Sequence, residues 1–179
     1  MEKLGRGRLI ERRQVYSGKI VDLIVDRIEL EGESYLREVV GHPGGVVVLG
    51  QLDDGRIPFV RQWRYPINKE LLELPAGKID PGEEPEATAI REMEEETGFR
   101  PRTIECVYSF YSSPGFCDEL LHCFFSRELE KTAIRREKDE HIVTEFLSLG
   151  EALSLAAQGG ILDAKTLVAL LWLDRKLRV

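Results

Sequence analysis

Cysteine is scarce in this sequence, and the cysteines present follow no disulfide or metal-binding pattern. They are odd in number, lack C-x-x-C spacing, and are Cys106, Cys117 and Cys123. This argues against a disulfide framework and against a zinc site. Internal repeats and low-complexity linkers are also missing, and 179 residues suit one compact domain, with or without a small N-terminal extension.

Long apolar segments are missing as well. The longest apolar stretch near the C-terminus, residues 161–173, is interrupted by Asp163 and Lys165, so it cannot serve as a membrane span. Residues 1–13 are charged and contain no apolar segment of the kind that a secretion signal requires. We therefore expect a soluble, cytoplasmic protein with no membrane partner.

Charge is unevenly distributed along the chain. The sequence holds 25 Lys and Arg against 32 Asp and Glu, a net charge of −7. Most of this excess lies in one short segment where a single arginine, Arg91, accompanies seven glutamates: Glu83, Glu84, Glu86, Glu92, Glu94, Glu95 and Glu96. A uniformly basic surface is absent, so we expect no nucleic-acid partner. A local acidic cluster points to a cation instead.

Strand-like and helix-like segments alternate loosely, which predicts an α/β fold with a mixed sheet rather than a purely parallel one. A tight turn at residues 53–55 joins two strand-like segments, 44–52 and 56–63. We predict an N-terminal strand extension at 1–40 and the main domain at 41–179. Other strands are expected at 14–25, 27–30, 34–40, 71–74, 103–111, 119–129 and 141–149, and helices at 85–97, 151–158 and 164–176.

The helix predicted at 85–97 carries most of the acidic residues. It has a proline in its first turn, acid just after it, and Gly98 in the position of a C-cap. At about 100° per residue, Glu92, Glu95 and Glu96 fall on one face. The neighbouring face is apolar and could pack on a sheet; it consists of Ala89, Ile90 and Met93.

This arrangement is unfavourable for an isolated helix. Like charges three or four residues apart each cost about 0.2–0.5 kcal/mol, and anions in the last turn oppose the helix dipole by about 0.3–1 kcal/mol each. Glu94 points away from the shared face, and we expect it to be only solvated. An ordinary solvated acidic face is the alternative that charge alone leaves open. Divalent cations would turn the repulsion into attraction, because they bind several carboxylate oxygens at once.

The wider segment decides between these interpretations. Residues 77–99, GKIDPGEEPEATAIREMEEETGF, fit the pattern G-x5-E-x7-R-E-U-x-E-E-x-G-U at every fixed position, where U is a bulky apolar residue. The segment resembles the Nudix box, the signature of the Nudix hydrolases. This resemblance implies a Nudix-type α/β/α sandwich with a mixed sheet, and a hydrolase that cleaves a nucleoside diphosphate linked to another moiety.

The resemblance also implies roles for residues of the box. Glu92 and Glu96 would be the principal Mg²⁺ ligands, with Glu95 beside them and the backbone carbonyl of Ala76 as a further ligand; Mn²⁺ would be a substitute ion. Such ions would neutralise a diphosphate and lower the pKa of bound water.

Four other positions of the box have structural roles in the family. Arg91 and Glu83 would form an ion pair that braces the loop against the helix. The simplest role for Gly77 is to allow a turn of the backbone, and the simplest role for Gly98 is to end the helix.

Segments outside the box resemble the ADP-ribose pyrophosphatase branch of the family. They are FVRQWRYP (59–66), ELLELPAGKID (70–80), YSSPGFCDELLH (111–122), REVVGHPGGVVV (37–48) and YSGKIVDL (16–23). By this resemblance, Arg37, Arg61 and Arg64 would contact phosphate or ribose, Glu119 would contact the ribose side, and Pro114 would mark the substrate loop. Arginine suits diphosphate oxygens because its guanidinium binds two of them at once, although an arginine at a strand end is a surface residue about as often as a ligand.

Several residues are candidates for the general base. Relatives supply a catalytic glutamate from an acidic loop before the last strand, and here that loop reads Glu137-Lys138-Asp139-Glu140. Glu140 is the first candidate and Asp139 or Glu137 the next. The remaining alternative is a helix glutamate such as Glu95 acting through water.

The sequence therefore predicts an enzyme that hydrolyses ADP-ribose to AMP and ribose 5-phosphate with Mg²⁺. In related proteins two subunits exchange N-terminal strands, so we expect a homodimer in which Arg37 serves the neighbouring site. Two alternatives remain open. One is the same chemistry on a sugar nucleotide, a dinucleotide or a nucleoside triphosphate; the other is a non-catalytic module that senses ADP-ribose.

Overall fold

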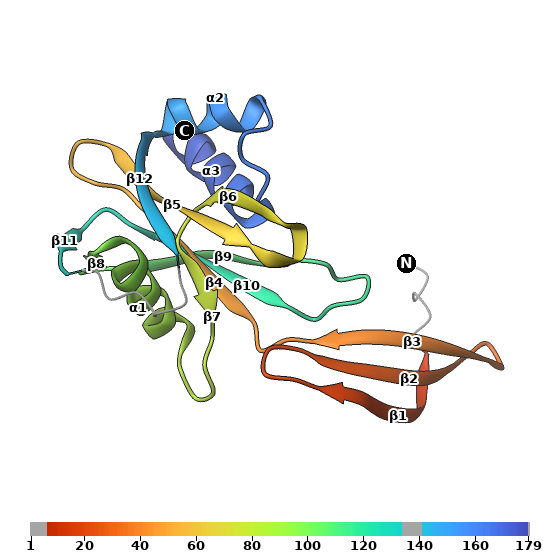
Figure 1. Cartoon of the computed structure of the whole chain (residues 1–179). Helices are drawn as coiled ribbons and strands as arrows, with labels where there is room; N and C mark the ends of the chain where they lie inside the picture. Colours follow the sequence, from red (N-terminus) through yellow and green to blue (C-terminus); the bar gives the residue numbers. More distant parts are fainter. Residues whose placement is uncertain (1–6, 134–140, 179) are drawn as a thin grey trace. The chain divides into compact units, whose positions relative to one another are not determined.

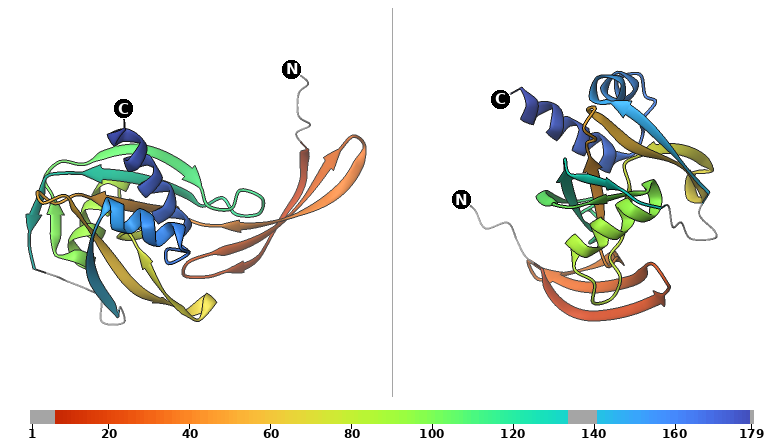
Figure 2. Two further views of the ribbon diagram at one scale, coloured as in Figure 1. Left: turned by 90° about the horizontal axis from the view of Figure 1, so that it is seen from above. Right: turned by 90° about the vertical axis from the view of Figure 1, so that its left-hand side faces the viewer.

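The computed structural model describes residues 7–133 and 141–178 (Figures 1 and 2). The chain divides into two compact units. The first contains the residues up to Gly44 together with Tyr111–Leu120, and the second contains Gly45–Phe110 and the chain from Leu121 onwards. None of the helices within the described ranges has the length and apolar character of a transmembrane segment.

The N-terminal unit is built on a three-stranded antiparallel sheet, which confirms the predicted strand extension. The single strand predicted at 14–25 is wrong, because the chain leaves the sheet at 18–21 and this segment is divided between two strands. Its strands are β1 (Arg8–Ser17), β2 (Asp22–Leu30) and β3 (Glu33–Gly41), with β2 in the centre. The tight turn between β2 and β3 places Glu31 and Gly32 at φ values of 55° and 85°. Of the residues in these three strands only Asp26 is buried, and Arg12 on β1 pairs with it through two hydrogen bonds of 2.8 and 2.7 Å.

The second unit contains a mixed four-stranded sheet in the order β7-β4-β10-β9. The central strand β4 (Gly45–Gly50) runs parallel to β10 (Leu120–Ser126) and antiparallel to β7 (Ala76–Lys78). The outer strand β9 is Glu105–Tyr111. All six residues of β4 are buried, which accounts for the unbroken apolar run Val46–Leu49 in the sequence.

A second, antiparallel sheet has the order β12-β5-β6 and consists of β12 (Ile142–Ser148), β5 (Arg56–Arg64) and β6 (Lys69–Glu73). The predicted turn at 53–55 does join β4 to β5, but the two strands enter different sheets. They cannot pair with each other because both edges of β4 are already taken by β7 and β10. The remaining short elements are η1 (Tyr65–Ile67), β8 (Phe99–Pro101) and β11 (Leu129–Lys131), of which β8 and β11 pair with each other.

Alternate side chains of β4 point to opposite faces and define two apolar clusters. Val46 and Val48 pack with Ala89 and Met93 of α1 (Pro85–Thr97). Val47 and Leu49 belong to a larger cluster that includes residues of β5, β6, α2 (Leu149–Ala157) and α3 (Ala164–Leu177). Helix α1 therefore covers one face of the mixed sheet and α2 and α3 lie beyond the other, as Figure 1 shows. This confirms the predicted α/β fold with a mixed sheet.

Candidate active site

Helix α1 has the bounds that the sequence predicts. It begins with Pro85 at its first position, where the missing N–H costs no hydrogen bond, and ends before Gly98. Gly98 adopts the left-handed conformation at φ 75° and its N–H donates to the carbonyl of Glu94 at 2.9 Å. A side chain at this position would be strained, so the glycine sets where the helix stops.

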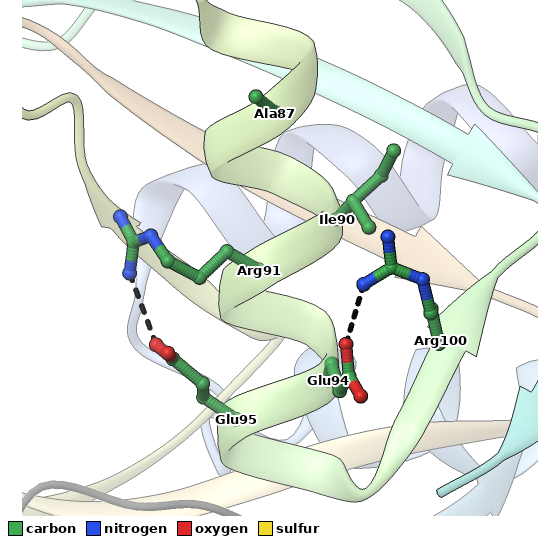
Figure 3. Close-up of a pocket in the computed structure, with 6 residues that line it drawn as sticks. All are labelled: Ala87, Ile90, Arg91, Glu94, Glu95 and Arg100. Carbon is green, nitrogen blue, oxygen red and sulfur yellow. Dashed lines mark hydrogen bonds and ion pairs between the residues drawn. The ribbon is translucent and has the colours of Figure 1, made fainter. Parts of the chain in front are cut away.

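Arg91 lies at the centre of what we call the helix cluster, formed with Glu83, Glu92 and Glu95. Its Nη1 donates to Glu92 Oε1 at 2.8 Å and to Glu95 Oε2 at 3.0 Å; Figure 3 shows the contact with Glu95. The carboxylates around it raise the pKa of Arg91, first of all Glu83 through its hydrogen bonds. One guanidinium thus partly neutralises several carboxylates on the face that the helical wheel predicts.

The loop before α1 is fastened to the helix by the same arginine. Arg91 Nε and Nη2 each donate to one oxygen of Glu83 at 3.0 Å. The hydroxyl of Thr88 donates to the same carboxylate at 2.8 Å. These hydrogen bonds, chiefly those from Arg91, lower the pKa of Glu83 to about 2. The loop and the helix therefore form one ion-paired unit.

Strand β7 approaches the acidic face of α1 through two small residues. The N–H of Ala76 donates to Glu96 Oε2 at 3.2 Å, and Glu96 is only 3% exposed. A methyl group added to Gly77 would overlap the Glu92 carboxylate. The backbone of β7 thus lies directly against two of the three carboxylates, which is what a site combining side-chain and carbonyl oxygens requires.

The donor set fits a hard divalent cation. Glu92, Glu95 and Glu96 offer only oxygen atoms, and Mg²⁺ prefers carboxylate and water ligands. In residues 7–133 and 141–178, no three acidic, histidine or cysteine side chains already stand in a metal-holding arrangement, and the Arg91 guanidinium bridges Glu92 and Glu95. Cation binding would therefore require these two carboxylates to loosen from Arg91.

The expectation that Glu94 is only solvated is wrong. Its carboxylate accepts a hydrogen bond from Arg100 Nη1 at 2.6 Å, across the turn that follows the helix (Figure 3). Glu94 and Arg100 line a pocket of about 380 Å³ on this flank of α1, together with Ala87, Ile90, Arg91 and Glu95. The helical wheel correctly places Glu94 away from the other glutamates. It could not predict the partner, because Arg100 lies on β8, outside the helix.

Arg64 belongs to a second group of charges, which we call the strand cluster: Arg64, Glu73, Lys165 and Asp163. Arg64 Nε and Nη2 donate to the two oxygens of Glu73 at 2.7 Å each. Lys165 on α3 donates to Glu73 at 2.5 Å and to Asp163 at 2.8 Å. The pKa of Arg64 is raised first by its hydrogen bonds to Glu73 and also by the charge of Glu96. The negative charge of Glu96 on α1 therefore acts on the guanidinium of Arg64.

Arg61, the other predicted ligand on β5, pairs with Glu145 of the neighbouring strand β12. Its Nε and Nη2 lie 2.5 and 3.2 Å from the two carboxylate oxygens. In the structure Arg61 therefore makes a cross-strand ion pair.

Three of the residues predicted to contact the substrate belong to the N-terminal unit. Arg37 on β3 is exposed, donates to the carbonyl of Leu36 at 2.9 Å, and lies over the ring of Tyr35. Glu119 lies 3.6 Å from His42 Nδ1. Pro114 lies in the turn of the loop 111–120.

That loop is fixed to the end of β3 within the same unit. The N–H of Val40 donates to the carbonyl of Phe116 at 2.7 Å, and Asp118 N–H donates to the carbonyl of Val40 at 3.2 Å. Of the candidates for the general base, Glu137, Asp139 and Glu140 lie outside the described residues, and Glu95 belongs to the helix cluster.

Two members of the strand cluster, Glu73 and Lys165, were not predicted from the sequence. A signal for Glu73 was present, because this glutamate interrupts the apolar run Leu71–Leu74 and a buried strand seldom keeps a charge without a partner. The partner itself could not be found in the sequence, because Lys165 is 92 positions away.

Comparisons with known proteins find a family model, curated relatives and a solved structure that this chain resembles. A family model for the NUDIX domain matches residues 41–170. An ADP-ribose pyrophosphatase of Bacillus subtilis (strain 168) is 43% identical over 94% of this chain and 93% of its own length. A methanol dehydrogenase activator of Bacillus methanolicus is 40% identical over 97% of this chain and 96% of its own length. The crystal structure of an ADP compounds hydrolase has a TM-score of 0.88 at 18% identity, covering 99% of this chain and 97% of that one, which is a likeness of fold.

Proposed function

The chain belongs to the Nudix hydrolase family, and on that premise we propose that it hydrolyses the diphosphate linkage of ADP-ribose to AMP and ribose 5-phosphate. One observation supports this above the others. The carboxylates of Glu92 and Glu96 lie against β7, with Gly77 leaving room for Glu92, and Glu95 shares the guanidinium of Arg91 with Glu92. The relative from Bacillus subtilis, an ADP-ribose pyrophosphatase, supports the choice of substrate.

The family is typically dependent on divalent metal ions, and we propose Mg²⁺ with Mn²⁺ as a substitute. The ligands would be Glu92, Glu95 and Glu96, with the backbone carbonyl of Ala76. The bound ion would neutralise diphosphate charge and lower the pKa of a coordinated water.

The protein's own residues would then bind and orient the diphosphate. Arg64 and Arg61 present guanidinium groups that can hold two phosphate oxygens each. Charge that spreads over the phosphoryl oxygens in the transition state would be stabilised by such fixed cations. For the general base, Glu140 remains our first assignment.

A substrate panel tests this proposal. ADP-ribose, GDP-mannose, a dinucleotide and a nucleoside triphosphate would be compared in Mg²⁺ by measuring nucleoside monophosphate or pyrophosphate release. We expect kcat/KM for ADP-ribose to exceed that of every other compound by at least about tenfold. Faster cleavage of any other member would assign the chemistry to a different substrate.

A regulatory function is the second candidate, because the relative from Bacillus methanolicus is a methanol dehydrogenase activator. We would measure the rate of a methanol dehydrogenase with and without this protein, using wild type and Glu96→Gln. Activation by both proteins would support a role independent of turnover, and activation by wild type alone would make regulation a consequence of hydrolysis.

We also propose a cytoplasmic homodimer with exchanged N-terminal strands in which Arg37 acts at the partner's site. Arg37→Ala and Glu96→Gln would each be nearly inactive alone. Subunits of the two variants, exchanged at equal concentrations, should regain about a quarter of wild-type activity, because half the dimers are mixed and each has one intact site. No recovery would place Arg37 at its own subunit's site or at none.

A further inference from the structure

Glu73 is the most buried member of the strand cluster, with a side chain only 1% exposed. It accepts hydrogen bonds from both Arg64 and Lys165. Burial pushes the pKa of Glu73 upwards, but the hydrogen bonds from Arg64 and the charge of Lys165 outweigh this effect and lower it. Glu73 is therefore an anion, and a buried anion needs a cation beside it at all times.

The two cations beside Glu73 differ in their freedom to move. The Lys165 side chain is 14% exposed and is held from two sides, by Glu73 and by Asp163. Asp163 is itself fixed, because its other oxygen caps α3 by accepting from Thr166 N at 3.0 Å. The Arg64 side chain is 37% exposed and extends from the last residue of β5. Arg64 can therefore turn away from Glu73 more readily than Lys165 can.

Glu73 occupies one edge of the Arg64 guanidinium, formed by Nε and Nη2. A phosphate can bind a guanidinium through two parallel N–H groups, and a diphosphate that took this edge of Arg64 would compete with Glu73 for the same donors. If Arg64 were the only cation beside Glu73, its departure would leave a buried carboxylate unpaired. That penalty would oppose substrate binding.

We propose that Lys165 is a positioning residue that keeps Glu73 paired while Arg64 turns from Glu73 to the substrate diphosphate. Lys165 would not touch the substrate, and it acts by making Arg64 available. The inference rests on the proposed function in that it takes a diphosphate as the ligand, but it does not depend on which group is attached to that diphosphate.

A double-mutant cycle over Lys165 and Glu73 tests the proposal. Lys165→Met keeps the length and apolar character of the side chain and removes its charge. It should lock Arg64 onto Glu73, raising KM for ADP-ribose and the Kd of ADP about tenfold, while kcat changes less than about twofold. Glu73→Gln keeps the size of the side chain and removes the buried charge. In that background Lys165→Met should change KM and Kd by less than about twofold.

Controls separate this role from general stabilisation of α3. Lys176→Met removes a lysine from the other end of the same helix and should leave KM unchanged. Lys165→Arg, which keeps the charge, should restore KM to near the wild-type value. Thermal melting would accompany each variant, and Lys165→Gln would replace Lys165→Met if the latter does not melt cooperatively.

The outcomes distinguish this inference from the proposed function. If Lys165→Met raises KM and Kd equally in the wild-type and Glu73→Gln backgrounds, or raises them in neither, the role of Lys165 is overturned. If the wild-type protein does not hydrolyse ADP-ribose, but the double-mutant cycle changes the Kd of ADP as expected, only the proposed substrate is overturned. Absence of both turnover and ADP binding in the wild-type protein overturns both.

Discussion

The helix cluster and the strand cluster are both centred on glutamates bonded to an arginine, yet they differ in charge balance and burial. In the helix cluster Arg91 is shared by Glu83, Glu92 and Glu95, and its side chain is 32% exposed. In the strand cluster two cations face two carboxylates, and Glu73 is almost fully buried. A partly exposed excess of carboxylates is suited to taking up a cation, whereas a buried and balanced group holds strands and a helix together.

The difference between the two clusters is tested most directly by removing one glutamate from each. Glu73→Ala leaves Arg64 and Lys165 without their buried anion and should lower the free energy of unfolding by about 3–5 kcal/mol. Glu83→Ala removes a more exposed partner of Arg91 and should cost about 1 kcal/mol. Urea titrations at pH 7 would measure both, and equal losses would contradict the contrast in burial.

Glu96→Gln tests whether the acidic helix serves catalysis rather than stability. The variant should keep the fold and lower kcat for ADP-ribose by at least about 10²-fold, through lost positioning of the metal ion. Glu86→Gln is the matched control, because Glu86 is an exposed glutamate in the first turn of the same helix. Near-normal turnover of Glu96→Gln at saturating Mg²⁺ would refute the assignment.

Gly77→Ala tests how closely β7 approaches the helix cluster. The added methyl group overlaps the Glu92 carboxylate, so we expect a loss of about 1–3 kcal/mol in unfolding free energy together with reduced activity. Gly150→Ala is the control, since a methyl group there meets no atom within 4 Å. Equal stability of the two variants would mean that Glu92 can move aside at no cost.

The pH dependence of stability should give the smallest effect. The folded-state pKa of Glu83 is about 2, below the ordinary value of 4.5, because Arg91 stabilises its charged form. A lowered folded-state pKa contributes stability that is complete above pH 4.5 and is lost as the pH falls towards 2. Wild-type protein should therefore lose more stability than Glu83→Gln over this range, as measured by Tm at fixed ionic strength. Parallel curves would show that the ion pair contributes nothing.

Much of the helix cluster could be predicted because its interactions are local. Arg91 and Glu95 lie four positions apart on α1, so helical periodicity places these two side chains together. Glu83 lies before the helix, and its pairing with Arg91 was implied by the resemblance to the Nudix box. Pro85 and Gly98 likewise mark both ends of α1 by their own backbone preferences. The fold class followed from the same local signals.

The strand cluster could not be predicted in this way. Nothing in the sequence around Glu73 indicates a lysine 92 positions later, and the pairing exists only because α3 packs beside the end of β6. The separation of β4 and β5 into two sheets is a further example. A short turn joins them, but the neighbours of β4 decide which strands can pair.

The sequence by itself determined the acidic helix and its ends, because these depend on interactions between residues close together in the chain. Only the tertiary structure decided that Gly77 lies against Glu92 and that Arg64 shares a buried glutamate with Lys165. Such contacts depend on how strands and helices pack. The contribution of the resulting ion pairs to stability depends on their burial, which the local sequence does not specify.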